Sequence, residues 1–221
     1  ENNNADNGGG MYNFHSDTTL ENCVFKNNTA SSDGAGMFNS YSSPTLTDCK
    51  FIGNTSSDDG GAIWNYKTDA TLTGCIFTSN IADDHGGGIY NIDSSATLTA
   101  CGFTNNTAAS GGAMFNYENS TAMISQSVIC DNSVPQIDGP FQDDGDNCIA
   151  DSCSELDDND DDGIIDCLDP CPNEPYNDAD GDGLEDCLDP CPDWPEDCVY
   201  VDSVPTITIA PGGSISIQDA I

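Results

Sequence analysis

One spacing governs the first 133 residues of the chain, because the same residue types return every 26 positions. Cysteine fills one such column and phenylalanine fills the column two residues later. The members are Cys23, Cys49, Cys75 and Cys101, and then Phe25, Phe51, Phe77 and Phe103. Glycine-rich phrases such as GGAIWN (60–65) and GGGIYN (86–91) keep the same step. Self-similarity at this period indicates a solenoid in which each repeat forms one coil.

The composition of the repeat favours strands over helices. Gly, Asn, Ser and Thr crowd each unit, whereas short alternating strings such as T-L-T (71–73) suit strands between turns. The sequence therefore predicts an all-β fold, a parallel β-helix of about five 26-residue coils with three short strands each. Alternation predicts that the columns of Leu72, Phe77 and Ile63 point inward, and that the Asn65 column ladders its amides at an inner turn.

An aromatic column runs through the same repeat. Its members are Tyr12, Phe38, Trp64, Tyr90 and Phe115. Each lies between two inward columns, so alternation predicts an exposed stripe of rings on the outside of the helix. Such a stripe could pack against another protein chain or against sugar rings. It could equally stabilise its own sheet or lie under a loop, and these alternatives stay open.

The paired phrases G-G-A-[I/V/L] and F-x-x-N resemble the repeats of polymorphic outer-membrane proteins. The string GAGMFNSYSSPTLTDCKFIGN (34–54) resembles the related β-helix repeats of large bacterial surface proteins. Both families belong to the right-handed parallel β-helix, pectate-lyase-like group, and the resemblance covers residues 1–133. It implies the fold, and a surface location, but leaves the function open because this fold hosts both enzymes and passive stalks.

The helix offers no recognisable set of catalytic residues. Polysaccharide lyases of the fold resemble one another in using an Arg or Lys base, but the chain has no arginine, and its lysines Lys26, Lys50 and Lys67 share no cluster. A glycoside hydrolase needs converging carboxylates, and the acids here are isolated. His15 and His85 lie more than two repeats apart. We therefore expect that the protein is not an enzyme.

A second repeat, with a period of 20 residues, fills an acidic segment that we place at 134–198. Its kernel is D-x-D-x-D-G, in which alternate carboxylates point to one side of a loop and the glycine permits a tight turn. Hard oxygen donors select Ca²⁺ over zinc or copper. The candidate calcium ligands are Asp158, Asp160, Asp162, Asp166, Asp169, Asp178, Asp180, Asp182, Asp186 and Asp189.

An EF-hand does not fit this segment, because the C-L-D-P-C-P that follows each kernel breaks any helix. The pattern resembles thrombospondin type 3 calcium repeats over residues 143–198. Since the segment has almost no apolar core, calcium and disulfides must supply its order. The segment holds seven cysteines, so one of them needs a partner from outside the segment. Cys130 is the natural choice, and the connectivity stays open. The disulfide candidates are Cys130, Cys148, Cys153, Cys167, Cys171, Cys187, Cys191 and Cys198.

Charge and cysteine content limit the partners and the compartment. A formal charge of −36, with three lysines and no arginine, excludes ordinary binding to nucleic acid or to an anionic membrane. No apolar run approaches the ~20 residues that a membrane-spanning helix needs. Twelve cysteines in 221 residues indicate an oxidising compartment. We expect an extracellular or cell-surface protein.

The last segment, 199–221, has a different pattern. Ile207 and Ile209 alternate with threonine, and Ile215 and Ile217 alternate with serine, across a Pro-Gly-Gly turn. We expect residues 205–221 to add as a strand to the first coil, near residues 8–14, of the next chain, giving a head-to-tail homopolymer. Folding back onto its own chain is the alternative.

These features together predict an extracellular structural protein, a calcium-stabilised module of a surface fibre, stalk or filament. The alternative function is an adhesin that binds glycans through the aromatic stripe.

Overall fold

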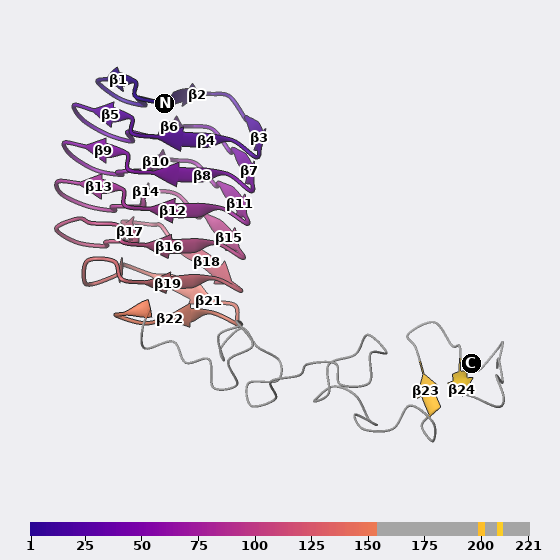
Figure 1. The fold of residues 1–221 in the computed structure, drawn as a ribbon. Helices are drawn as coiled ribbons and strands as arrows, with labels where there is room; N and C mark the ends of the chain where they lie inside the picture. Colours follow the sequence, from indigo (N-terminus) through magenta and orange to yellow (C-terminus); the bar gives the residue numbers. More distant parts are fainter. Residues whose placement is uncertain (154–198, 202–206, 210–221) are drawn as a thin grey trace. The chain divides into compact units, whose positions relative to one another are not determined.

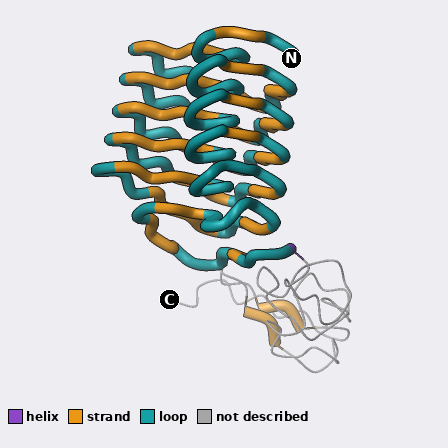
Figure 2. Tube along the Cα trace, turned by 90° about the vertical axis from the view of Figure 1, so that its left-hand side faces the viewer, coloured by secondary structure: helices purple, strands orange, loops and turns teal. Residues whose placement is uncertain are grey.

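In the computed structural model, each sequence repeat forms one coil of a parallel β-solenoid (Figure 1). The structure describes residues 1–153, 199–201 and 207–209. Equivalent residues of successive coils are paired strand to strand, as in Ile63↔Ile89, Leu72↔Leu98 and Phe77↔Phe103. The predicted fold class is therefore confirmed: stacked coils of 26 residues form an all-β solenoid. Figure 2 shows that turns and loops connect the short strands of every coil.

Each of the first four coils contributes strands to four sheets, one more than the three that we predicted. The additional sheet, sheet A, consists of two-residue strands, which are too short to show alternation in the sequence. Its strands are β1 (Asn4–Ala5), β5 (Thr29–Ala30), β9 (Thr55–Ser56) and β13 (Ile81–Ala82). Sheet B carries the aromatic column. Its strands are β2 (Met11–Phe14), β6 (Met37–Ser40), β10 (Ile63–Tyr66), β14 (Ile89–Ile92), β17 (Met114–Tyr117) and β20 (Ile137–Asp138).

The T-L-T and C-x-F strings form the other two sheets. Sheet C consists of β3 (Thr19–Glu21), β7 (Thr45–Thr47), β11 (Thr71–Thr73), β15 (Thr97–Thr99), β18 (Ala122–Ser125) and β21 (Phe141–Asp143). Sheet D consists of β4 (Val24–Lys26), β8 (Lys50–Ile52), β12 (Ile76–Thr78), β16 (Gly102–Thr104), β19 (Val128–Cys130) and β22 (Cys148–Ile149).

Close backbone contact explains the glycine phrase. Gly60 has φ +65°, and a Cβ there would lie 2.6 Å from the carbonyl oxygen of Ile63. At Gly61 a Cβ would lie 2.4 Å from the carbonyl oxygen of Gly87 in the next coil. Any side chain would therefore collide with backbone, so this corner of the coil requires glycine.

The interior of the solenoid is built from the predicted columns. Leu72, Phe77 and Ile63 are fully buried, and so are Cys49 and Cys75 of the cysteine column. The phenylalanine rings stack on one another along the axis: the ring centroids of Phe51 and Phe77 lie 5.0 Å apart and their planes differ by 3°. Burial and stacking of identical residues in each coil make the core continuous from coil to coil.

Two columns of buried asparagine side chains form hydrogen bonds to one another and to backbone groups that are enclosed inside the turns. In the first, the amide of Asn39 donates to Asn65 and the amide of Asn65 donates to Asn91, at 2.9 and 2.8 Å. This is the amide ladder that the sequence predicted. The second column includes Asn80, whose amide donates both to the Phe51 carbonyl and to the side chain of Asn106, each at 2.9 Å. Both ladders tie each coil to the next.

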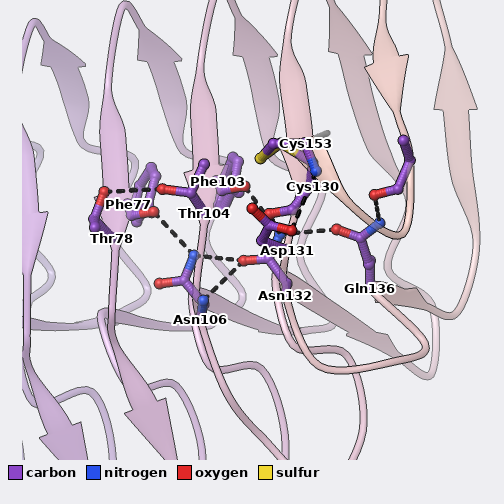
Figure 3. Close-up of a disulfide and its surroundings, with 11 residues drawn as sticks. Phe77, Thr78, Phe103, Thr104, Asn106, Cys130, Asp131, Asn132, Gln136 and Cys153 are labelled. Carbon is purple, nitrogen blue, oxygen red and sulfur yellow. Dashed lines mark hydrogen bonds between the residues drawn. A yellow bond between two sulfur atoms is a disulfide. The ribbon is translucent and has the colours of Figure 1, made fainter. Parts of the chain in front are cut away.

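The solenoid continues past residue 133, where we predicted its end. Strands β20, β21 and β22 pair in parallel with β17, β18 and β19 and form a shorter last coil. This coil lacks the glycine and C-x-F phrases, so periodicity could not find it. Gln136 accepts a hydrogen bond from the amide of Asn132 and thereby ends the second ladder (Figure 3). The chain divides into two units, 1–156 and 157–221.

The tail contains a short strand pair of its own. β24 (Ile207–Ile209) coincides with the predicted isoleucine–threonine strand. It pairs antiparallel with β23 (Val199–Val201), an element that we did not predict. The expected second strand around Ile215 and Ile217 lies outside the described residues.

Candidate functional site

The predicted aromatic column lies on the outward side of sheet B. Trp64 sits in β10 between Ile63 and Asn65, both of which are fully buried, so alternation directs its ring away from the core. In-register pairing places Trp64 beside Phe38 of β6 and beside Tyr90 of β14. The aromatic column of the sequence therefore forms a stripe of neighbouring residues in the structure.

The stripe is less exposed than we predicted. Tyr12 is 55% exposed, but Phe38 and Tyr90 are only 8% and 7% exposed. The rings stack face to face: the centroids of Phe38 and Trp64 lie 4.2 Å apart, with 9° between the ring planes. Because each inner ring covers the face of its neighbour, these rings stabilise the sheet, and Phe38 and Tyr90 have little surface left for a sugar. The expectation of an exposed binding stripe is wrong for Phe38 and Tyr90.

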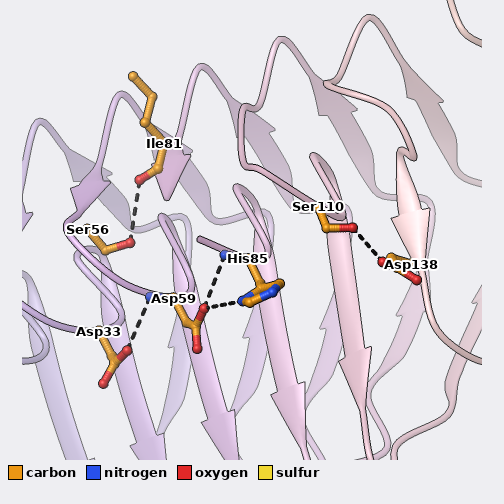
Figure 4. A network of polar contacts seen from close by, with 7 residues as sticks. All are labelled: Asp33, Ser56, Asp59, Ile81, His85, Ser110 and Asp138. Atoms are coloured by element: carbon orange, nitrogen blue, oxygen red, sulfur yellow. Dashed lines mark hydrogen bonds and ion pairs between the residues drawn. The ribbon is translucent and has the colours of Figure 1, made fainter. Parts of the chain in front are cut away.

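An acidic turn borders the stripe on one side. The Asp59 carboxylate accepts hydrogen bonds from the backbone N–H of His85, at 3.1 Å, and pairs with His85 Nδ1 at 2.9 Å (Figure 4). The His85 ring lies 4.5 Å from that of Phe115. Burial raises the pKa of Asp59, although the hydrogen bond and the charge of His85 act in the opposite direction. Burial and the charge of Asp59 also raise the pKa of Tyr90.

A second group of aromatic residues borders the stripe on its other side, where sheet B ends. We call it the turn ridge: Phe14, His15, Tyr41, Tyr66 and Lys67. Phe14 and Tyr41 are 55% and 42% exposed. Lys67 Nζ lies 5.3 Å from the Tyr41 ring centroid and 5.1 Å from that of Tyr66. We did not predict the ridge, although Phe14 and Tyr66 share the outward parity of the stripe and could have been found by it.

Few groups suited to catalysis or metal binding converge in the part of the chain that the structure describes. No cluster of three or more His, Cys, Asp or Glu side chains there could hold a metal ion. The ten predicted calcium ligands, Asp158 to Asp189, lie outside the described residues. Among those residues, no helix is long and apolar enough to cross a membrane.

The cysteines separate into two groups. Cys23, Cys49, Cys75 and Cys101 of the repeat column are free thiols, and burial raises the pKa of Cys49. Cys130, at the end of β19, forms a disulfide with Cys153, and the two sulfur atoms appear in yellow in Figure 3. Cys148 is disulfide-bonded as well. The candidates Cys167, Cys171, Cys187, Cys191 and Cys198 lie outside the described residues.

Two stretches of the chain, residues 48–66 and 74–92, match the model of the Chlamydia polymorphic membrane protein repeat. Each stretch begins at the turn before a sheet D strand and ends with a sheet B strand, so the matches cover equivalent parts of successive coils. Neither the curated proteins nor the solved structures contain a match to the chain. The repeat matches and the parallel solenoid together agree with a β-helix like that of polymorphic membrane proteins.

Proposed function

We propose that the chain is a structural module of a bacterial surface protein, located outside the cell. The observation that carries this proposal is the match of residues 48–66 and 74–92 to a membrane-protein repeat, on a solenoid whose interior is laddered from coil to coil. Continuous ladders of Asn and Phe resist bending, because displacement of one coil breaks contacts with both neighbours. A rigid solenoid of this kind is better suited to a stalk or fibre than to a binding site that must open and close.

The acidic segment supports the finer form of the proposal, a calcium-stabilised connector of the thrombospondin type 3 kind. Its carboxylates recur with a 20-residue period, which a merely soluble linker does not require. Calcium would neutralise much of the charge of −36. We further propose that the protein acts without catalysis, and that successive chains assemble head to tail through the 205–221 tail.

Labelling of intact cells tests the surface location. An antibody against the solenoid, applied to cells of the organism that makes the protein, should bind without permeabilisation. Protease added outside should remove the signal, while an antibody against a cytoplasmic protein serves as the control. A signal that appears only after lysis would contradict the proposal.

A further inference from the structure

The turn ridge places Tyr41 and Lys67 at a turn position where a left-handed backbone is required. In five successive coils, the turns after sheets B, C and D each contain a residue in this backbone region. After sheets C and D these positions are held mostly by residues that adopt it cheaply, among them Gly74, Gly53 and Asn105. After sheet B they are held by His15, Tyr41, Lys67, Asp93 and Glu118, and the φ values of Tyr41 and Lys67 are 52° and 49°.

A positive φ costs backbone energy at Tyr41 and Lys67, because bulky side chains disfavour it, whereas His15 is a residue type that tolerates it better. Ring contacts within the ridge offset part of this cost, since His15 stacks on Tyr41 with centroids 5.0 Å apart, but the contact of Lys67 adds little. The Lys67 ammonium lies 3.5 Å from the Tyr41 hydroxyl in an exposed pair, and such pairs contribute little in water. Residues in this backbone region cluster at functional sites, but here they also occur at Ser79, Ala100 and Gln126, so it is the exposed rings of the ridge that mark it as a candidate site.

The chemistry of the ridge identifies the class of ligand. The Phe14 and Tyr41 rings meet edge to face, with centroids 6.3 Å apart, and the His15 ring stacks on Tyr41 at 5.0 Å. Exposed rings therefore alternate with hydrogen-bonding groups: the tyrosine hydroxyls, an imidazole and the Lys67 ammonium. This mixture fits a pyranose ring, whose C–H faces pack on aromatic rings while its hydroxyls form hydrogen bonds.

The negative charge of the protein limits which sugars the ridge can bind. Asp93 lies close enough to act on the charge state of Tyr41, and the whole chain carries −36. A single lysine does not overcome this field for a polyanion. We propose that the turn ridge binds a neutral glycan. The proposal goes beyond the structural role above, and it assigns sugar contact to residues other than those of the stripe.

A glycan array of neutral and acidic oligosaccharides, probed with the full chain in calcium, tests the inference. We expect neutral glycans to bind, and the best of them to be measured by calorimetry. Tyr41→Ala and Lys67→Ala should each weaken that affinity at least tenfold. The matched controls are Phe141→Ala, at a ring exposed to a similar extent (40% against 42%), and Lys50→Ala on sheet D. Both controls should bind like the unchanged chain.

A second variant separates binding from folding. Tyr41→Asn retains a residue that tolerates positive φ, so its Tm should stay the same or rise while binding is lost. The proposal is overturned if no neutral glycan binds, if acidic glycans bind equally well, or if the control variants lose as much affinity as the ridge variants. A large fall in Tm for Tyr41→Asn would overturn it too, because the ridge would then be structural.

Discussion

Each buried asparagine of the second ladder satisfies several groups at once. Asn80 accepts hydrogen bonds from the backbone N–H and the amide of Asn54, and its own amide donates to Phe51 and Asn106. Leucine or alanine at this position would leave these partners unpaired in the buried interior. Buried polar groups without partners are costly, so the ladder stabilises the fold chiefly by avoiding that cost.

Asn80→Ala should therefore destabilise the solenoid strongly. With several buried groups left unpaired at ~1–3 kcal/mol each, we expect a loss of about 3–5 kcal/mol. Denaturant unfolding of the two proteins measures the difference. The control is Asn119→Ala, which removes an exposed hydrogen bond to Asp93 and should cost under about 1 kcal/mol. Equal losses at the two positions would contradict the assigned role of the ladder.

The raised pKa of Asp59 predicts a pH dependence. A carboxyl whose pKa is higher in the folded state holds its proton more tightly there, so its contribution to stability is present at low pH. That contribution is lost as pH rises from the ordinary aspartate range, near 4, through the raised value. Asp59→Asn should remove this part of the slope of Tm against pH. Asp69→Asn, at another turn, controls for the loss of one charge, and parallel curves for Asp59→Asn and the unchanged chain would refute the assignment.

At the scale of the strand, the sheet B stripe acts as a stack. Because the Phe38 and Trp64 rings lie 4.2 Å apart, their substitutions should not be additive. A double-mutant cycle of Phe38→Ala and Trp64→Ala should give a coupling of ~0.5–1.5 kcal/mol in unfolding free energy. A cycle of Phe38→Ala with Phe141→Ala, which lies on sheet C, should give none. Zero coupling for the stacked pair would mean that the rings do not stabilise one another.

The strands that the sequence predicted well are those with alternation over at least three residues. The columns of Leu72 and Phe77 keep a large apolar residue in five successive coils, with polar or variable neighbours, so both their faces and their burial could be predicted. The two-residue strand Thr55–Ser56 of sheet A offers no alternation, and the last coil around Ile137 has lost the repeated phrases. Their pairing depends on the coil above, which local sequence does not reveal.

The candidate site was predicted only in part for a related reason. Alternation gives the side of the sheet on which Tyr90 lies, but it does not give what covers that side. The stacked rings and the acidic turn at Asp59 and His85 bury it. The ridge was overlooked because its column mixes Tyr41 with Lys67 and Asp93, and a column without a constant residue type carries no periodic signal.

At the scale of the whole molecule, the solenoid and the acidic segment should respond differently to calcium. The solenoid, which continues through β22, has its own core and ladders, whereas the order of 154–198 is proposed to depend on bound cations. Chelation with EDTA should therefore increase protease cleavage within 154–198 and leave the solenoid intact. Mass spectrometry of the fragments locates the cuts, and added magnesium serves as a control for calcium. Cleavage that chelation leaves unchanged would contradict the calcium proposal.

Assembly is the property on which the structural proposal depends most. β2 is the edge strand of sheet B, and an edge strand presents backbone groups that can pair with another chain. In the tail, β24 already pairs with β23 on one side, so strand addition would use its other edge. Such a contact joins different surfaces of two chains, and without ring closure it propagates into a filament.

Deletion of residues 205–221 tests this contact. The filament proposal predicts that the full chain forms linear assemblies in calcium, visible by electron microscopy and growing with protein concentration. The shortened chain should remain monomeric in sedimentation while its circular dichroism and calcium binding persist, because the solenoid and the aspartates of 158–189 are untouched. If the tail instead folds back on its own chain, the full chain stays monomeric at every concentration and the deletion changes only stability. A shortened chain that still forms the same fibres would show that assembly uses another surface.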